Sequence, residues 1–256
     1  MTAMEMQQLA DRVWEAVQST TAISPLTDTN PDLTIDSAYE IQEDILERHT
    51  RTGATIAAAK LGLTSKAKQQ QMNVSEPLYG WLTDAMRVDG KASVDDYIQP
   101  RAEPEVAFML GDELGGPDIT TAQVIAATES VAPALDILDS RFAGYRFTLA
   151  DIAADNSSAA GFVLGTPVAP PPDLRVVGCV FEKNDDLVAT AAGAAVMDHP
   201  AAAVAWFVRK LHERERTLPA GTTVLAGAWT AAEPIAPGDR LRATFDHIGS
   251  VELEAT

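Results

Sequence analysis

The sequence predicts an α+β protein in which helices come first and strands dominate the remainder. Apolar residues recur at helical spacing within residues 4–53, whereas the second two-thirds of the chain contain more strand-like runs than helical ones. There is no regular alternation of strands and helices, no G-x-G-x-x-G sequence and no internal repeat. These absences argue against a dinucleotide-binding α/β fold and against a repeat architecture.

Length, charge and cysteine content narrow the range of functions. With 256 residues, of which 46% are hydrophobic, the chain can form one large domain or one domain with a small cap. Its net charge of −18 argues against nucleic acid or anionic membranes as partners, because basic surfaces bind phosphate groups. The single cysteine, Cys179, lies in an apolar strand-like run, so it is expected in the core and not in a disulfide or a thiolate metal cluster. The N-terminus lacks the basic start and apolar centre of a signal peptide and no long apolar segment follows, so we expect a cytoplasmic protein.

The N-terminal part is expected to be helical. Residues 4–18 carry apolar residues at helical spacing, and Asp36 can cap a second helix that ends near Gly53. We therefore predict that residues 1–53 pack as a helical segment on one β-rich structural unit, which residues 54–256 form.

Lys60 ends a run of small residues that is typical of a short strand. A Gly turn and a helix capped by Ser65 are expected to follow. Lysine is rarely buried without a partner, so Lys60 either carries a cation into a site or bends out to solvent. Residues 73–86 contain several aromatic side chains and are expected to form a loop that can cover a pocket.

Two acids at the start of a strand form the centre of the candidate site. Residues 106–110 are continuously apolar, as in a buried strand. Glu103 and Glu105 precede this run two positions apart, so their side chains point the same way from bases about 7 Å apart. Such a pair either binds a hard divalent cation such as Mg²⁺ or Mn²⁺, or is solvated at an exposed strand start. Pro104 indicates an edge strand or an irregular strand entry.

A further acid lies within an apolar strand. Residues 121–130 are expected to form a short helix and residues 131–138 a strand that contains Asp136. If Asp136 is buried it needs a partner, because an unpaired buried charge is strongly unfavourable. Residues 149–158 are expected to form a helical turn that runs into a polar loop.

The last third is predicted to be mostly strands around one helix. A turn at residues 184–186 between two strand-like runs is typical of a hairpin. His199 and Pro200 begin a helix that continues through Leu211, and two or three strands finish the chain. The four histidines show no metal-ligand spacing, so none is assigned as a ligand.

Motifs along nearly the whole chain resemble one enzyme family. The matching stretches are K-L-G-L-T-S-K from Lys60, P-R-A-E-P-E from Pro100, P-A-L-D-I-L-D-S-R from Pro133, A-D-N from Ala154, H-P-A-A-A-V-A-W from His199 and G-S-V from Gly249. In order and spacing they resemble the 2-oxopent-4-enoate hydratase and 4-oxalocrotonate decarboxylase group of the fumarylacetoacetase superfamily. The resemblance implies a metal-dependent lyase that acts on a 2-oxo acid in the meta-cleavage pathway of aromatic degradation. It also implies a β-rich mixed-sheet roll, similar to the C-terminal domain of fumarylacetoacetase, with an N-terminal helical segment and assembly into homo-oligomers.

The resemblance also implies the ligands of the metal. By matching position these are Glu103, Glu105 and Asp136, with Mg²⁺ or Mn²⁺ as the ion. Asp136 stands where the family usually has Glu, and its side chain is one methylene shorter. Asp139 is the alternative third acid.

Lys60 is the predicted catalytic residue, placed to hold a carboxylate or to move a proton. The resemblance implies substrate contacts at Leu61, Ser158 and Thr230. The implied substrate is a small 2-oxo dicarboxylic acid, and a complex with a related hydratase or decarboxylase subunit is left open.

Two lyase reactions fit this resemblance. Decarboxylation of 2-oxohex-3-enedioate (4-oxalocrotonate) gives 2-hydroxypenta-2,4-dienoate and CO₂, whereas a hydratase adds water to that product and forms 4-hydroxy-2-oxopentanoate. Both reactions begin with polarisation of a metal-held 2-oxo acid, and they differ at the far end of the pocket. Pro104, residues 78–86 and residues 147–149 resemble the decarboxylase branch more closely, so decarboxylation is predicted and hydration is the alternative. A non-catalytic partner subunit is the third interpretation, and degenerate metal acids would favour it.

Overall fold

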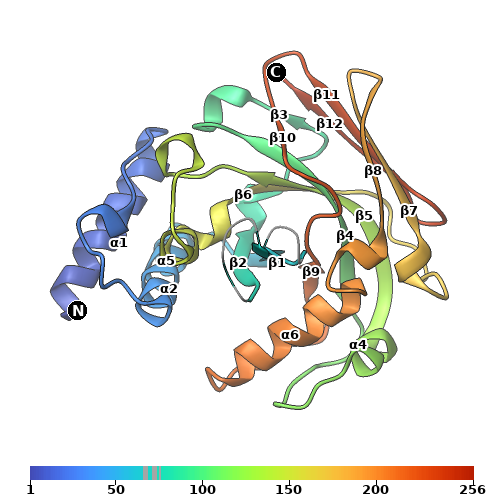
Figure 1. The fold of residues 1–256 in the computed structure, drawn as a ribbon, viewed down its shortest axis with the longest axis horizontal. Helices are drawn as coiled ribbons and strands as arrows, with labels where there is room; N and C mark the ends of the chain where they lie inside the picture. The colour runs from blue at the N-terminus through green and yellow to red at the C-terminus, as the bar shows by residue number, and fades with distance from the viewer. Residues whose placement is uncertain (66–68, 71–73, 75) are drawn as a thin grey trace.

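The structure is a computed structural model that describes residues 1–65, 69–70, 74 and 76–256. Two N-terminal helices lie at one end of the molecule (Figure 1). They are α1 (Ala3–Ser19) and α2 (Ile35–Arg51), and they pack against each other. Thr34 caps α2, because its side chain accepts a hydrogen bond from the N–H of Ser37. The prediction that Asp36 caps this helix was therefore wrong, since Asp36 lies inside the first turn.

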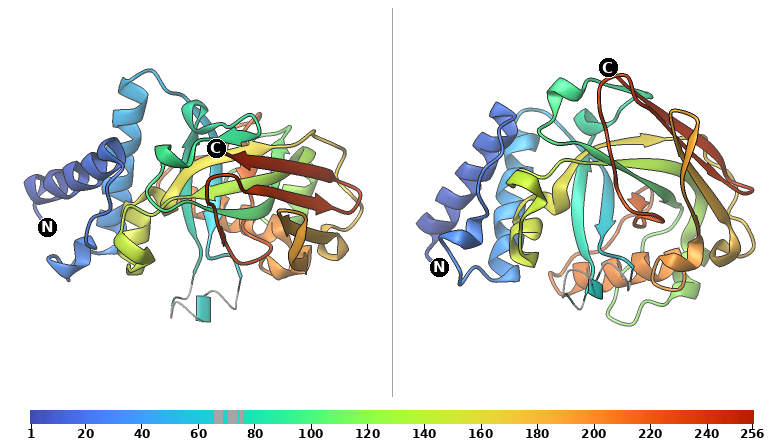
Figure 2. Two further views of the ribbon diagram at one scale, coloured as in Figure 1. Left: turned by 90° about the horizontal axis from the view of Figure 1, so that it is seen from above. Right: turned by 45° about the horizontal axis from the view of Figure 1, so that its top comes forward.

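Twelve strands form two mixed sheets in the part of the chain that the structure describes (Figures 1 and 2). The larger sheet has the order β2-β1-β9-β4-β5-β6 with β10 beside β4, and the smaller has the order β3-β12-β11-β7-β8. One neighbouring pair in each sheet is parallel, β1 with β9 and β12 with β3, and the others are antiparallel. The strands of the larger sheet are β1 (Ile56–Gly62), β2 (Leu78–Thr83), β4 (Arg101–Leu110), β5 (Thr128–Leu138), β6 (Ala159–Leu164), β9 (Thr223–Leu225) and β10 (Glu233–Pro234). Those of the smaller sheet are β3 (Lys91–Ala92), β7 (Gly178–Lys183), β8 (Asp186–Ala192), β11 (Arg240–Phe245) and β12 (Gly249–Ala255).

The larger sheet curls so that its two outer strands approach each other. Just after β2, the N–H of Val88 donates to the carbonyl of Phe162 in β6 at 2.9 Å. Small and apolar side chains from six strands form a buried cluster on the inner face of this curl, among them Ala58, Leu82, Ala107, Ala134, Phe162 and Leu225. This arrangement agrees with the predicted β-rich roll.

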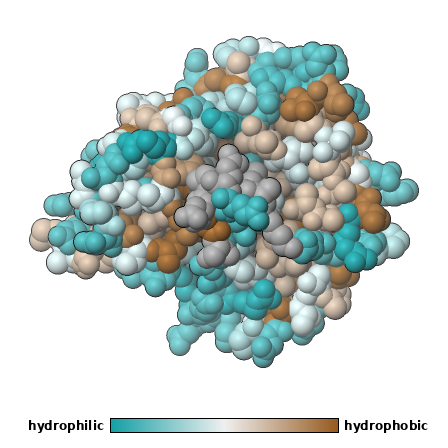
Figure 3. Space-filling model, in the orientation of Figure 1, coloured by the Kyte–Doolittle hydropathy of each residue, from teal (hydrophilic) through white to brown (hydrophobic). Residues whose placement is uncertain are grey.

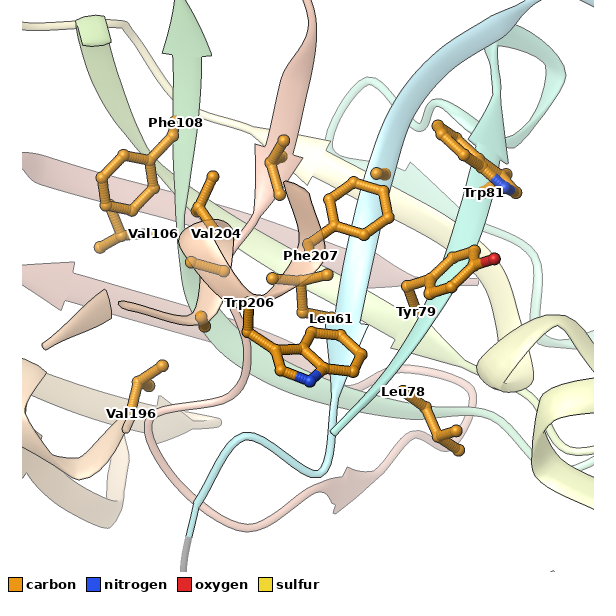
Figure 4. Packing of buried hydrophobic residues seen from close by; sticks show 14 of the residues in the cluster. Leu61, Leu78, Tyr79, Trp81, Val106, Phe108, Val196, Val204, Trp206 and Phe207 are labelled. Atoms are coloured by element: carbon orange, nitrogen blue, oxygen red, sulfur yellow. The ribbon is translucent and has the colours of Figure 1, made fainter. Parts of the chain in front are cut away.

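Helix α6 (Pro200–His212) covers the outer face of the same sheet. Figure 4 shows Trp206 and Phe207 of α6 among apolar side chains of β1, β2 and β4. Side chains alternate along a strand, so Leu61 of β1 faces α6 whereas Lys60 faces the inside of the curl. In the same way Val106 of β4 faces α6 and the acids of β4 face inward. The face of the sheet toward α6 therefore carries an apolar core, and the opposite, inner face carries the polar site.

Strand β2 occupies much of the region predicted as a loop over residues 73–86. It is buried along its length and pairs with β1, and Asp84–Met86 form a 3₁₀ turn after it. Tyr79 stacks on Tyr39 of α2 with ring centroids 4.4 Å apart, and Trp81 packs against α6. These aromatic side chains therefore belong to the core and do not cover a pocket. The prediction was wrong because a strand buried on both faces lacks an alternation of apolar and polar residues.

Pro104 lies inside the sheet and not at an edge. Its carbonyl accepts a hydrogen bond from the N–H of Trp229 at 2.9 Å, so its ring nitrogen faces the same neighbouring segment. That segment, residues 226–232, joins β9 to β10 and lies outside both strands. The sheet therefore requires no N–H from residue 104.

Several other predicted elements occur with small shifts of their ends. Helix α4 (Thr121–Ala127) is shorter than predicted, because β5 already begins at Thr128. Helix α5 (Leu149–Ala154), the β7–β8 hairpin and the start of α6 at a His199 cap agree with the predictions. Four strands finish the chain, although β9 and β10 have only three and two residues.

Three further observations concern the predictions on burial, helix position and membranes. Cys179 is buried in β7, where burial raises the pKa of its thiol to about 12, as expected of a core residue. The helix predicted after Ser65 falls largely on residues 66–68 and 71–73, which lie outside the described residues. No helix in the described ranges is long and apolar enough to cross a membrane.

Gln42 of α2 connects the N-terminal helices to the rest of the protein. Its side-chain Nε2 donates to the carbonyls of Tyr79 in β2 and Ala153 in α5, both at 3.0 Å. The helical segment is therefore packed on the main body. The division into units at residue 53 stays a proposal.

Candidate metal and active site

Three carboxylates meet on the inner face of the larger sheet. Glu103 and Glu105 lie two positions apart on β4, and Asp136 of β5 lies directly opposite Glu103 in the antiparallel register. One oxygen from each of the three lies within 4.8 Å of the others. All three side chains are buried, with Glu105 and Asp136 fully inaccessible. The strand register therefore brings the three predicted metal ligands together.

Lys60 supplies the positive charge beside these acids. Its Nζ lies 2.7 Å from Oδ2 of Asp136 and donates to the carbonyl of Ser157 at 2.9 Å. The side chain is only 2% exposed, so the alternative in which Lys60 bends out to solvent does not hold. The predicted strand end was also short by two residues, because β1 continues to Gly62.

The charges of the cluster are only partly balanced. Burial raises the pKa of Glu105 well above its ordinary value, and repulsion by Asp136 adds to this shift, whereas Lys60 opposes it. One oxygen of Glu105, Oε2, accepts a hydrogen bond from the N–H of Gly227 at 2.7 Å. Its other oxygen, Oε1, is buried and has no hydrogen-bond partner among the described residues. Convergent carboxylates with an unbonded buried oxygen fit a hard divalent cation, which prefers oxygen ligands.

Gly227 holds Glu105 in place and requires a glycine. Its φ of +110° is one that L side chains rarely adopt. A Cβ atom at this position would lie 2.0 Å from Oγ1 of Thr64. Only glycine can bring this N–H to Glu105 without displacing the chain near Thr64.

A turn after α5 presents the carbonyl that Lys60 uses. Asn156, Ser157 and Ser158 have φ values of +50°, +54° and +55°, so all three residues are in the left-handed region. The Asn156 side chain accepts from the N–H of Trp81 and donates to its carbonyl, both at 2.8 Å. These two bonds attach the turn to β2 and fix the position of the Ser157 carbonyl.

Arg141 and Asp155 form a buried ion pair beneath this turn. Arg141 Nε and its backbone N–H both donate to the Asp155 carboxylate, and Arg141 Nη1 donates to the carbonyl of Ala159 at 3.1 Å. Burial raises the pKa of Asp155 to about 6, although Arg141 opposes the shift, so the carboxyl stays mainly ionised at neutral pH. The pair ties the end of β5 to the turn that carries Ser157.

Replacing Asp155 by Ala is expected to destabilise the protein by about 3 to 5 kcal/mol, because it leaves the Arg141 charge buried without a counter-ion. The exposed pair of Arg146 and Asp28 provides a control, and Asp28→Ala is expected to change stability little. Urea unfolding of the three proteins measures both effects. Equal stability of the Asp155 variant and the parent protein would show that Arg141 is balanced by other groups.

A pocket of about 270 Å³ opens beside the acid cluster, and Lys60 and Glu103 line it. Ser157 and Ser158 add polar groups to this pocket, and Leu138, Phe147 and Ile152 provide apolar walls. A small organic acid fits such a cavity, which combines a few polar groups with apolar walls.

The predicted substrate contacts are placed differently from one another. Ser158 lines the pocket, and its hydroxyl donates a long hydrogen bond of 3.4 Å to the Asp155 carboxylate. Leu61 points its side chain into the core beneath α6 (Figure 4), so only its backbone faces the site. Thr230 is half-buried and its hydroxyl donates to the carbonyl of Ala231, which itself lines the pocket. Contacts of these three residues with substrate stay predictions.

Asp139, the alternative third acid, has another role. Its carboxylate accepts hydrogen bonds from the N–H groups of Ile98 and Gln99, at 2.8 and 2.7 Å. It follows β5 and lies outside the cluster formed by the three acids. The geometry therefore favours Asp136 as the third ligand.

Sequence reasoning gave no role to Gly227, Ser157, Arg141 or Asp155. Arg141 and Asp155 both lie within stretches that carry the family resemblance, and this was the available signal. Their pairing depends on a turn that brings positions 14 residues apart into contact, and no local pattern shows it.

The site lies on the inner face of a curled mixed sheet. It combines three clustered acids, a buried lysine and an adjoining pocket, and these features suit a divalent cation and a small organic acid. Comparison with known proteins agrees with this class. The family described as fumarylacetoacetate (FAA) hydrolase C-terminal matches residues 55–254, and the chain belongs to this family.

Full-length relatives carry the names of two reactions. A 4-oxalocrotonate decarboxylase from Pseudomonas sp. (strain CF600) is 38% identical over 98% of this chain and 97% of its own length. A 2-hydroxyhexa-2,4-dienoate hydratase from Comamonas testosteroni is 37% identical over 96% of this chain and 95% of its own length. The solved structure of 4-oxalocrotonate decarboxylase from Pseudomonas putida G7, complexed with magnesium and adipate, has a TM-score of 0.97 at 36% identity and covers 100% of this chain and 99% of that chain.

Proposed function

We propose that this chain decarboxylates 2-oxohex-3-enedioate to 2-hydroxypenta-2,4-dienoate and CO₂, with Mg²⁺ or Mn²⁺ bound. The observation that carries the proposal is the convergence of three buried acids and Lys60 beside one pocket. The solved decarboxylase structure with magnesium and adipate supports both the ion and the substrate class, because adipate is a six-carbon dicarboxylate like the proposed substrate. Glu103, Glu105 and Asp136 would hold the cation, which supplies Lewis-acid polarisation of the substrate's 2-oxo group.

Lys60 is proposed to give a proton to the 2-oxygen. In the reaction the C5–C6 bond breaks, its electron pair moves through the alkene toward the 2-oxygen, and CO₂ leaves. The Lys60 ammonium has three hydrogens and contacts two described acceptors, Asp136 and the Ser157 carbonyl, so a third hydrogen is available to substrate. Proton transfer to that oxygen completes the dienol product.

The walls of the pocket support decarboxylation. Leu138, Phe147 and Ile152 form apolar walls of the space beside Lys60, and Ser157 and Ser158 contribute its polar groups. Apolar walls also suit the diene product, which is less polar than the substrate.

Hydration is the second candidate, because the hydratase from Comamonas testosteroni is nearly as similar as the decarboxylase. The purified protein is to be given each substrate with Mg²⁺, with CO₂ release and product identity followed by NMR. Release of CO₂ from 2-oxohex-3-enedioate supports the proposal. Conversion of 2-hydroxypenta-2,4-dienoate to 4-hydroxy-2-oxopentanoate without CO₂ release would replace it with hydration, and no turnover of either would contradict both.

Assembly into homo-oligomers is part of this proposal, and one exposed apolar region supports it. Val176 and Leu187, which are 76% and 64% exposed, lie just before β7 and on β8. Figure 3 shows apolar surface on the side of the molecule where these strands lie. Sedimentation of the purified protein tests for oligomers, and co-purification tests for the complex with a related hydratase subunit.

A further inference from the structure

Arg101 is a charged residue on the wall of the pocket, and the sequence analysis assigned it no role. It begins β4 two positions before Glu103, so its side chain leaves the strand on the same face as the metal acids. Arg101, Glu103 and Lys60 line the same cavity. Arg101, Glu103 and Glu105 thus form a row of side chains along one face of β4, with the guanidinium at one end and the acids at the other.

The guanidinium of Arg101 is not matched by an acid. Arg101 forms no salt bridge and no side-chain hydrogen bond with the residues that the structure describes. Its observed contact is with the ring of Tyr145, which lies 4.0 Å from the guanidinium carbon. In a chain of net charge −18, an arginine on a pocket wall that has no acidic partner among the described residues is suited to bind an anion.

Tyr145 holds the guanidinium in a defined orientation. The Tyr145 hydroxyl lies 3.1 Å from the carbonyl of Gln99 and 3.2 Å from that of Leu138. The ring is therefore anchored to the chain just before β4 and at the end of β5. A guanidinium stacked on this fixed ring keeps its N–H groups at its edge, where they can bind a carboxylate with two parallel hydrogen bonds.

The spacing along β4 matches a six-carbon dicarboxylate. Two strand positions separate the bases of Arg101 and Glu103 by about 7 Å. The end carbons of an extended six-carbon diacid are about 6 Å apart, since each of five bonds of about 1.5 Å advances the chain by somewhat less than its length. A diacid of this length with its 2-oxo end at the acid cluster can extend along the pocket wall that Arg101 lines.

We propose that Arg101 is a specificity-determining residue that binds the far carboxylate of a 2-oxo dicarboxylic acid, with Tyr145 as a positioning residue. This inference rests on the proposed function, which it deepens by naming the group that selects a dicarboxylate over a monocarboxylate. The far carboxylate loses its charge as CO₂ forms, so Arg101 binds the substrate more strongly than the transition state. Loss of Arg101 should therefore raise KM and should not lower kcat.

The test measures binding and turnover in Arg101→Gln. In calorimetry with Mg²⁺ present, the parent protein is expected to bind adipate more tightly than hexanoate. Arg101→Gln is expected to lose about 10- to 100-fold in adipate affinity, the range for a charged hydrogen bond, and little in hexanoate affinity. KM for 2-oxohex-3-enedioate should rise by a similar factor while kcat changes little.

Three further variants complete the design. Arg146→Gln removes the same charge from an exposed pair outside the pocket and should keep the preference for adipate. Tyr145→Phe keeps the ring but removes the hydroxyl that anchors it, so this variant should lose part of the preference, and Tyr145→Leu, which also removes the ring, should lose more. Arg101→Lys keeps the positive charge but cannot donate two parallel hydrogen bonds, so its affinity for adipate should be intermediate. This variant also provides a test if Arg101→Gln does not fold.

The outcomes separate this inference from the proposed function. An unchanged preference for adipate and an unchanged KM in Arg101→Gln would overturn the role of Arg101 even if the parent protein releases CO₂. Loss of the preference in that variant supports the role even if the parent protein catalyses another reaction.

Discussion

Glu105→Gln is expected to abolish magnesium-dependent turnover while leaving the fold intact. Glu105 is fully buried, its Oε2 accepts from the N–H of Gly227, and its Oε1 has no hydrogen-bond partner among the described residues. Glutamine has the same shape, so its amide oxygen can still accept from Gly227. Its NH₂ group then faces the cluster, where it donates a hydrogen bond and cannot bind a cation.

The stability of this variant provides a second readout. Without metal, Glu105→Gln removes one of three clustered carboxylates, so the variant should melt at a higher temperature than the parent protein. With Mg²⁺ the parent should gain stability and the variant should not, because only a protein that binds the ion in its folded form is stabilised by it. Glu129→Gln, at an exposed position on β5, controls for loss of one charge. Full activity of Glu105→Gln would remove Glu105 from the metal site.

Lys60→Met is expected to lower kcat by about 10²-fold or more, the lower range for loss of a general acid. The variant lacks the proposed proton donor and also leaves Asp136 without the ammonium 2.7 Å from its carboxylate. Removing one member of a buried ion pair destabilises a protein by about 3 to 5 kcal/mol. A divalent cation can replace much of this lost positive charge, so Mg²⁺ should restore the stability of the variant but not its activity.

Kinetics and melting with and without Mg²⁺ separate the two roles of this lysine. Lys91→Met removes an exposed lysine that pairs with Glu254 and is expected to leave both measurements unchanged. Normal kcat in Lys60→Met, combined with lowered stability, would show that Lys60 only holds Asp136 in place.

The acids of the site could be predicted from the sequence because their relation is partly local. Glu103 and Glu105 share a face by the two-residue period of a strand, and Asp136 stands out as an acid in an apolar run. Their convergence depends on the register of β4 with β5, which pairs Glu103 with Asp136. The local sequence does not contain this register, and only the family resemblance suggested it.

Other features could not be predicted for physical reasons. The strand around Gly80 was interpreted as a loop, because both of its faces are buried and its pattern lacks alternation. Pro104 was expected at an edge strand or an irregular strand entry, whereas it lies inside the sheet, where the chain between β9 and β10 leaves its nitrogen without a required partner. Arg101 lies in the P-R-A-E-P-E stretch that carries the family resemblance, but its place on the pocket wall could not be predicted, because an arginine without an acidic partner has the same sequence signature as a solvated one. In each case contacts distant in sequence determine the outcome.

The left-handed turn at residues 156–158 sets a limit on how far this protein can be made thermostable without loss of activity. A left-handed conformation costs a non-glycine residue about 1 to 2 kcal/mol, and three successive residues bear that cost here. Selection in the laboratory for heat resistance alone should therefore favour glycine at positions 157 and 158. Position 156 differs, because glycine there would remove the two stabilising Asn156 hydrogen bonds to Trp81. Glycine at 157 or 158 makes the backbone more flexible, so it would hold the Ser157 carbonyl less firmly against Lys60. A more thermostable variant obtained by such changes is expected to have a lower kcat than the parent protein.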